Sequence, residues 1–259
     1  MVDCSTMHAG VAIALSLLFA LAQREPGFVD WERRTVRCIG IGAPDLRGEA
    51  GSALVARVGT ERTARRAAQK NCMATLQDVA IETGRTVGTA LSANGRLTVA
   101  LEQIVSRSAA DGVLRFFSDG GVELDMEVPL DGELSDLLLP APRAPAPVVG
   151  GSAGATGVLV DAHALGLLPA LAPRVLDDAG REIYGPGLLS RRARQGGTAA
   201  YARDVASALK SFGKRLGHAP KVVRAIGVQG CDVVVSKGDA QALRGSRSLE
   251  EGRVVIVAP

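Results

Sequence analysis

The chain has 259 residues, which is enough for one large or two ordinary domains. A hydrophobic content of 47% argues against global disorder, and an aromatic content of 3% means that Val, Leu, Ile and Ala must build the core. The net charge of +3, from 30 basic and 27 acidic residues, is too balanced to indicate nucleic-acid binding, so no nucleic-acid partner is expected.

The N-terminus reads as an export signal over residues 1–22. Residues 11–22 form an apolar run that is too short to cross a bilayer, since a spanning helix needs roughly 20 apolar residues. Ala20-Leu21-Ala22 supplies a small-x-small cleavage pattern, which would leave Gln23 as the first residue of the mature chain. Residues 1–10 carry no Lys or Arg, so a buried N-terminal helix is the alternative. Export predicts a periplasmic protein with no transmembrane span after cleavage.

Three cysteines remain after that cut: Cys38, Cys72 and Cys231. A Cys38–Cys72 disulfide is possible, because Cys38 falls on an expected strand and Cys72 on the next helix. The alternative is that all three are small buried hydrophobic side chains. No CxxC or Cys/His spacing is typical of zinc, so no metal is expected.

An N-terminal α+β domain is predicted over residues 28–139. A strand in the second half of 31–43 contains Gly40 and Gly42, but the third glycine of a dinucleotide fingerprint is missing, so no nucleotide site is expected. A long helix is predicted over 59–83, with an apolar stripe of Ala64, Ala68, Cys72, Leu76 and Val79. Its other side carries Arg62, Arg65, Arg66, Gln69 and Lys70, which would either meet a polyanion or simply be solvated.

The rest of this domain is predicted as a strand over 85–91, a helix with Leu97, Leu101, Ile104 and Val105, and a hairpin of 113–118 with 122–128. The alternating Glu123, Asp125 and Glu127 indicate a solvent-exposed face rather than a catalytic acid/base pair. A short helix is expected over 131–139. Two helices would then cover one face of a mainly antiparallel sheet.

A Pro/Gly-rich linker over 140–156 precedes a C-terminal α+β domain at 157–259, again with a mainly antiparallel sheet. The linker is interpreted as a spacer, with a ligand for aromatic grooves as the alternative. Residues 157–185 begin as a strand and become an apolar loop, because Gly166, Pro169 and Pro173 prevent a regular helix. A hairpin turning at 177–180 follows.

The remaining elements are a basic loop at 185–197, a helix at 198–216, strands at 222–228 and 231–236, a helix at 238–244 capped by Ser236, and a buried strand at 253–258. The helix at 198–216 would bury Ala202, Val205, Leu209 and Phe212. The basic loop contributes Arg191, Arg192 and Arg194, which are the candidate residues for binding an anionic ligand.

Two common signatures of catalysis are missing from the sequence, since neither Walker A nor H-E-x-x-H occurs. Asp161 and His163 could share one side of a strand, but no third metal ligand follows from spacing. We therefore expect no catalytic residues, no metal and no cofactor.

Several segments resemble bacterial envelope proteins: "VDAHALGLLPALAPRVLDDAGREIYG", "ARRAAQKNCMATL", "VELDMEVPLDGELSDLLLP", "YARDVASAL", "VVRAIGVQGCDVVVSKGDAQALR" and "RVVIVAP". They are similar to the LPP-type lipoprotein family and to flagellar assembly protein T-like envelope proteins. That resemblance implies a fold and an envelope setting, not a reaction. A lipid anchor is not expected, because Cys4 precedes the apolar run and Gln23 occupies the cleavage point.

The leading hypothesis is therefore a non-enzymatic periplasmic protein that acts through contacts with another envelope protein, with the flagellar basal body or outer membrane as the settings that the resemblance suggests. A module that binds an anionic glycan or lipid headgroup is the second hypothesis. An enzyme that uses Asp161 and His163 is the third.

Overall fold

The structure, a computed structural model, describes residues 26–44, 52–140 and 154–258. The predicted export signal at 1–22 and most of the predicted linker lie outside these residues. The described chain forms an N-terminal unit (26–140) and a C-terminal unit (154–258), each with its own sheet and helices, so the α+β class is confirmed. Among the described residues, no helix has both the length and the apolar character needed to cross a membrane.

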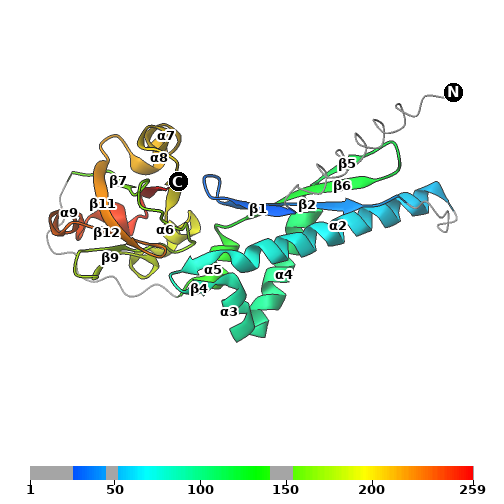
Figure 1. Ribbon diagram of the computed structural model, residues 1–259, viewed down its shortest axis with the longest axis horizontal. Coiled ribbons are helices and arrows are strands. Elements are labelled where there is room, and N and C mark those ends of the chain that lie inside the picture. Colours follow the sequence, from blue (N-terminus) through cyan, green and yellow to red (C-terminus); the bar gives the residue numbers. More distant parts are fainter. Residues whose placement is uncertain (1–25, 45–51, 141–153, 259) are drawn as a thin grey trace, which may run out of the picture.

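The N-terminal unit is a four-stranded antiparallel sheet with helices on one face (Figure 1). The sheet order is β1-β2-β6-β5, and the expected hairpin is formed by β5 and β6. The elements are β1 (Gly27–Asp30), β2 (Thr35–Gly42), α2 (Ala53–Asp78), β3 (Ala80–Glu82), β4 (Arg85–Thr86), α3 (Val87–Ala93), α4 (Gly95–Ala110), β5 (Val113–Phe116), β6 (Val122–Pro129) and α5 (Glu133–Leu138).

Helix α2 packs against the sheet through the predicted apolar stripe, whose members from Ala64 to Leu76 are fully buried. The helix lies unusually close to β2. A Cβ added at Gly40 would lie 2.1 Å from the Ala64 carbonyl oxygen, and one at Gly42 would lie 2.1 Å from the Thr60 carbonyl oxygen. The two glycines of the G-x-G pattern thus permit helix packing. A disulfide between Cys38 and Cys72 also joins β2 to α2, with 5.5 Å between the Cα atoms.

Two elements of this unit differ from the sequence prediction. The long helix ends at Asp78 rather than at residue 83, because residues 80–82 form β3 and pair with β4. The strand predicted at 85–91 is wrong beyond Thr86. The Thr86 side chain accepts a hydrogen bond from Thr89 N and caps α3, so the chain becomes helical there.

The acidic row on β6 is not simply solvated. Glu123 is 6% exposed, and its Oε1 accepts a 2.8 Å hydrogen bond from Arg115. Asp125 and Glu127 both form ion pairs with Arg37 on the neighbouring strand. Cross-strand charge pairing, which an isolated strand pattern does not contain, therefore organises this face of the sheet.

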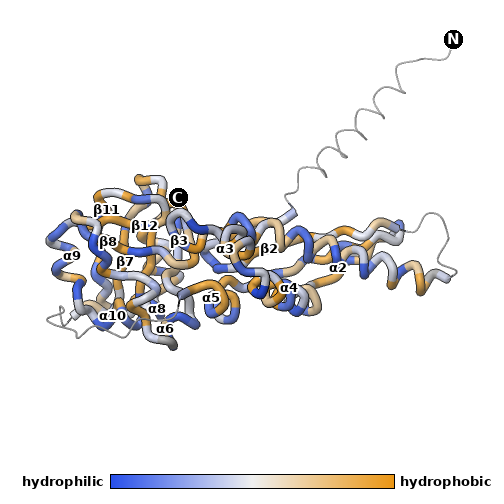
Figure 2. Tube along the Cα trace, turned by 90° about the horizontal axis from the view of Figure 1, so that it is seen from below, coloured by the Kyte–Doolittle hydropathy of each residue, from blue (hydrophilic) through white to orange (hydrophobic). Residues whose placement is uncertain are grey.

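The C-terminal unit is a seven-stranded sheet in the order β10-β13-β7-β11-β12-β8-β9. Its strands are largely hydrophobic (Figure 2), and all four residues of β13 are buried. The elements are β7 (Val158–Asp161), β8 (Val175–Leu176), β9 (Glu182–Tyr184), η1 (Pro186–Leu188), α6 (Arg191–Gln195), β10 (Ala200–Ala202), α7 (Val205–Ser211), α8 (Gly213–Leu216), β11 (Lys221–Gln229), β12 (Asp232–Val235), α9 (Lys237–Leu243), α10 (Arg247–Glu250) and β13 (Val254–Val257).

The expectation of a mainly antiparallel sheet does not hold in this unit. Only β11–β12 and β8–β9 pair antiparallel, and the other four pairings are parallel. The connection through α7–α8 accounts for part of this, because a helical crossover returns the chain in the same direction and makes β11 run parallel to β10. The helix cap at Ser236 is confirmed, since its Oγ accepts a hydrogen bond from Asp239 N.

The single helix predicted at 198–216 is wrong. Ala200–Ala202 pairs with β13 as a strand, and Asp204 then starts α7 through a capping box. Leu209, predicted to be buried, is 44% exposed. The tertiary partner β13 decides the strand, because it buries the short Ala-rich stretch that would otherwise suit a helix.

The two units contact each other at several points. The buried apolar loop after β7 donates hydrogen bonds from Leu171 N and Ala172 N to carbonyl oxygens of β3, and both residues belong to the N-terminal core. Thr83, between β3 and β4, donates from its hydroxyl to Gln229 O at 2.9 Å and accepts from Cys231 N at 3.0 Å. The loop between β7 and β8 is therefore held against a core, as predicted.

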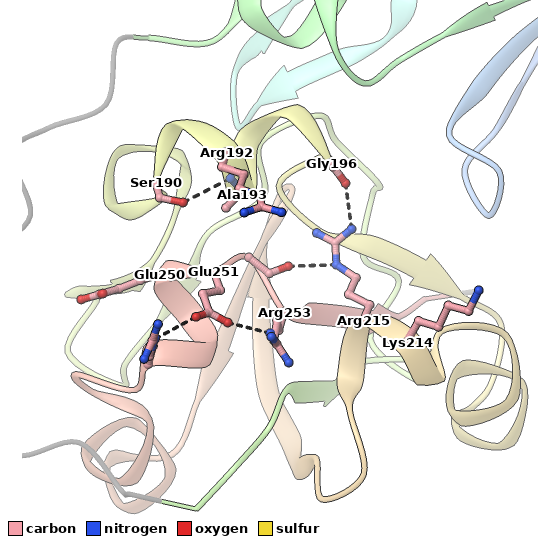
Figure 3. A pocket seen from close by; sticks show the side chains of 11 residues that line it. Ser190, Arg192, Ala193, Gly196, Lys214, Arg215, Glu250, Glu251 and Arg253 are labelled. Atoms are coloured by element: carbon pink, nitrogen blue, oxygen red, sulfur yellow. Dashed lines mark hydrogen bonds and ion pairs between the residues drawn. The ribbon is translucent and has the colours of Figure 1, made fainter.

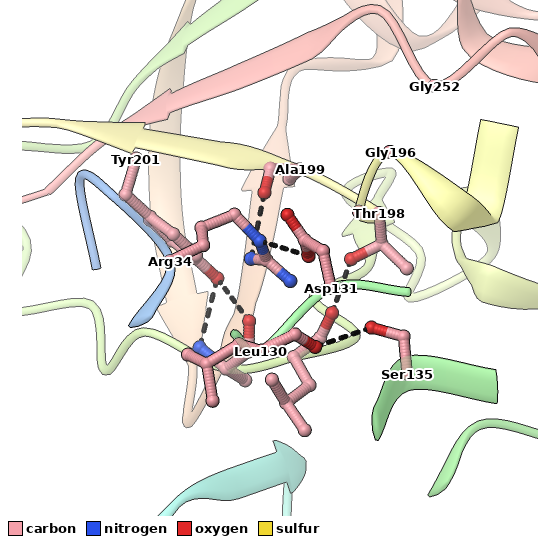
Figure 4. Close-up of polar contacts among 12 residues, drawn as sticks. Arg34, Leu130, Asp131, Ser135, Gly196, Thr198, Ala199, Tyr201 and Gly252 are labelled. Carbon is pink, nitrogen blue, oxygen red and sulfur yellow. Dashed lines mark hydrogen bonds and ion pairs between the residues drawn. The ribbon is translucent and has the colours of Figure 1, made fainter. Parts of the chain in front are cut away.

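Arg34 makes a further buried contact between the units (Figure 4). It lies in the turn between β1 and β2 with a φ of 54°, and its side chain is 4% exposed. Its Nε donates to Asp131 Oδ1 at 2.6 Å, and its Nη1 donates to the Ala199 carbonyl at 2.9 Å. Arg34 thus connects the N-terminal sheet to the segment that leads into β10.

Candidate functional site

The candidate site is a cavity of about 720 Å³ in the C-terminal unit. We call it the basic cavity, because five of its lining side chains are basic and two are acidic. They come from α6, α8, α10 and the residues just before β13 (Figure 3). The lining residues are Ser190, Arg192, Ala193, Gly196, Lys214, Arg215, Arg247, Glu250, Glu251, Gly252 and Arg253.

Helix α6 forms one wall and carries the arginines singled out in the sequence. The predicted basic loop is in fact helical here, because Ser190 Oγ accepts a hydrogen bond from Ala193 N and caps the helix. Arg192 is exposed and lines the cavity. Arg194 points away into the domain and is only 4% exposed. Arg191 begins the helix, and its side chain lies outside the described part of the chain.

Arg215 on α8 forms the opposite wall with a structural role. Its Nε donates to Gly252 O at 2.9 Å, Nη1 donates to Gly196 O at 3.0 Å, and Nη2 donates to Gly197 O at 2.6 Å. Burial lowers the pKa of this guanidinium from its ordinary value. The side chain links the backbone that follows α6 to the backbone that precedes β13, and its charge lies in the wall of the cavity.

Glu251 neutralises part of the positive charge. Its Oε1 pairs with Arg247 Nε and its Oε2 with Arg253 Nε, each at 2.8 Å. Arg192 and Lys214, in contrast, are exposed and make no ion pair among the described residues. These two cations are the ones available to an incoming anion.

The arrangement suits the binding of an anion. Ser190 Oγ, the hydroxyl in this lining, is already used as a helix cap. Basic side chains around a concave site attract and bind carboxylate or phosphate groups through charge-assisted hydrogen bonds. The basic cavity can therefore hold an anionic group.

The Asp161–His163 pair lies elsewhere, at the end of β7. His163 Nδ1 and Asp161 Oδ1 are 2.6 Å apart, and the His163 side chain is 56% exposed. Burial raises the pKa of the Asp161 carboxyl, but the hydrogen bonds from His163 outweigh it and the pKa lies below its ordinary value of 3.8. Within residues 26–44, 52–140 and 154–258, no group of three His, Cys, Asp or Glu is placed to hold a metal ion.

Sequence reasoning missed Lys214, Arg215, Arg247 and Arg253 as partners of Arg192. The only signal in the sequence is that each is basic, and their uneven spacing along the chain matches no motif. They meet because α8, which precedes β11, and α10, which precedes β13, border the same cavity as α6.

Residues 157–259 match a family model described as "Treponema pallidum Tp0624, second domain". The matched range contains every residue that lines the basic cavity. No curated protein matches the chain. The C-terminal unit is thus similar to one domain of a multidomain bacterial protein.

Proposed function

We propose that this protein is an exported, non-enzymatic component of the cell envelope, and that its basic cavity binds an anionic group carried by an envelope partner. The observation that carries the binding proposal is the pair of exposed cations, Arg192 and Lys214, which make no ion pair among the described residues, in a cavity lined by five basic and only two acidic side chains. The ligand would carry a carboxylate or a phosphate, because both groups accept charge-assisted hydrogen bonds from an Arg guanidinium and a Lys ammonium.

Export is supported by two features of different origin. The sequence pattern at 1–22 is that of a cleaved signal, and the chain bridges Cys38 to Cys72. Disulfides form and persist mainly in oxidising compartments such as the bacterial periplasm. Fractionation and intact-mass measurement of the native protein test this part. A periplasmic species that begins at Gln23 supports it, whereas a cytoplasmic species that begins at Met1 contradicts it.

Calorimetric titration with citrate and with pyrophosphate tests the cavity, and the two probes distinguish carboxylate from phosphate. We expect saturable, salt-sensitive binding that weakens about tenfold to a hundredfold in Arg192→Gln, because a hydrogen bond to a charged group is worth about 1.5–3 kcal/mol. Arg96→Gln is the matched control, since Arg96 is exposed on α4 of the other unit. Equal binding by both variants, or no saturable binding, contradicts the proposal.

A further inference from the structure

The far end of the N-terminal unit exposes large apolar side chains from three different elements. Leu54 and Val55 on the first turn of α2 are 72% and 58% exposed, and Ile41 at the end of β2 is 61% exposed. Phe116 and Phe117 at the turn between β5 and β6 are 47% and 51% exposed. We call this group, together with Val58, the apolar tip.

The register of the sheet and the length of the helix bring these residues to one end of the unit. Ile41 lies there on the other face of the sheet, because its neighbours Gly40 and Gly42 face α2. Phe116 pairs with Val122, which in turn pairs with Gly42, so the β5–β6 turn and the end of β2 are at the same edge. Gly42 lies against Thr60, so the first turns of α2 extend beyond that edge (Figure 1). The first turns of α2 contact β5 directly, because the Arg57 guanidinium lies 4.0 Å from the centroid of the Phe116 ring.

The exposed surface of α2 changes from apolar to basic away from the tip. Leu54, Val58, Arg62 and Arg66 are spaced four residues apart, so they form one ridge of neighbouring side chains on the helix. All four are exposed. At 1.5 Å per residue, Arg62 follows Leu54 by about 12 Å along the axis. Lys70 extends the basic part of the ridge.

Two acidic groups near this ridge, among the residues that the structure describes, already have partners. Glu61 lies 3.6 Å from Arg57, and Asp119 accepts a hydrogen bond from Gly121 N within its own turn. The apolar tip is therefore followed along α2 by the exposed basic side chains of Arg62, Arg66 and Lys70, which we call the basic collar.

We infer that the apolar tip inserts into the interface of an anionic lipid bilayer, with Arg62 and Arg66 contacting the headgroups. Interfacial segments bury apolar side chains about 5–10 Å deep while basic side chains lie at the headgroups, which is the order found along α2. A projecting tip assembled from three elements suits a deformable lipid surface, and its basic collar complements anionic headgroups. This inference is independent of the basic cavity, which lies in the other unit.

Co-sedimentation of the full chain with vesicles tests the inference, using phosphatidylcholine alone and phosphatidylcholine mixed with phosphatidylglycerol. We expect Leu54→Ser combined with Phe117→Ser to weaken binding to the mixed vesicles by about tenfold or more, since two large apolar side chains then no longer leave water. Arg62→Gln combined with Arg66→Gln should cost about fivefold for each charge on the mixed vesicles only.

Leu168→Ser is the matched control, because Leu168 is 63% exposed in the C-terminal unit. Every variant keeps residues 1–22, so any lipid affinity of that segment contributes equally to all of them. Circular dichroism checks that the exposed-site variants remain folded. Binding by the Leu54/Phe117 variant at the wild-type level overturns the inference, as does the absence of any preference of the wild type for anionic vesicles.

Discussion

Replacing Gly40 with alanine tests whether close helix packing explains the G-x-G pattern. The added Cβ would lie 2.1 Å from Ala64 O and 2.2 Å from Ala68 N, whereas ordinary contacts begin at 3.4 Å. Both atoms belong to the backbone of α2, so the whole helix would have to move by about 1 Å, and overpacking of this kind costs ~1–3 kcal/mol or more. For a chain of this length that cost corresponds to a fall in Tm of roughly 2–12 °C.

Gly59→Ala provides a control with the opposite expected sign. Gly59 lies inside α2, and no atom lies within 4 Å of an added Cβ. Alanine should therefore raise the stability by ~0.5–1 kcal/mol through helix propensity alone. Thermal unfolding followed by the fluorescence of Trp31, which packs against both cores, measures both variants. A Gly40→Ala protein as stable as the wild type would refute the packing argument.

Two further predictions concern the disulfide and the exposed acid–base pair. Reducing the Cys38–Cys72 bond, which closes a separation of 34 residues, should lower the free energy of unfolding by about 3.8 kcal/mol in the loop-entropy treatment, as measured by urea titration. An unchanged urea midpoint would contradict this, and Cys231→Ala serves as the control. In His163→Ala, the pKa of Asp161 should rise in an NMR titration, because the imidazole that lowers it by a side-chain hydrogen bond is gone, while the backbone N–H of residue 163 remains. The pKa of Asp161 is lower in the folded state than in the unfolded state. The pair therefore stabilises the fold at pH values above the ordinary pKa of 3.8, and this stabilisation is lost as the pH falls through the folded-state pKa. An identical Asp161 pKa in both proteins would refute the assignment.

Patterns within a single element were enough to predict the N-terminal sheet. Val122, Leu124, Met126 and Val128 alternate strictly, and all four are buried in β6. The alternation is informative because one face of the strand packs against helices. The same local pattern could not show that Glu123 would be buried by Arg115, since the partner lies on another strand.

Prediction failed where distant segments decide the structure. Residues 200–202 are short and Ala-rich, and only pairing with β13 near the end of the chain makes them a strand. The prediction of the candidate site was incomplete for a related reason. Arg192 was predicted, but its cationic neighbours Lys214 and Arg253 come from other elements, and a five-residue helix turns Arg194 away from them. Proximity in the fold, and not motif spacing, assembles the basic cavity.

The position of the disulfide in the sequence also bears on the order in which the chain can fold. Cys38 and Cys72 are consecutive cysteines, and both lie in the first third of the chain. A polypeptide that emerges N-terminus first into any compartment that oxidises thiols therefore presents both partners long before Cys231 has been synthesised or translocated. The native pair is the first that such a nascent chain can form beyond residue 22, so correct pairing would need no later reshuffling by an isomerase. Cys231 arrives last, and folding buries its thiol.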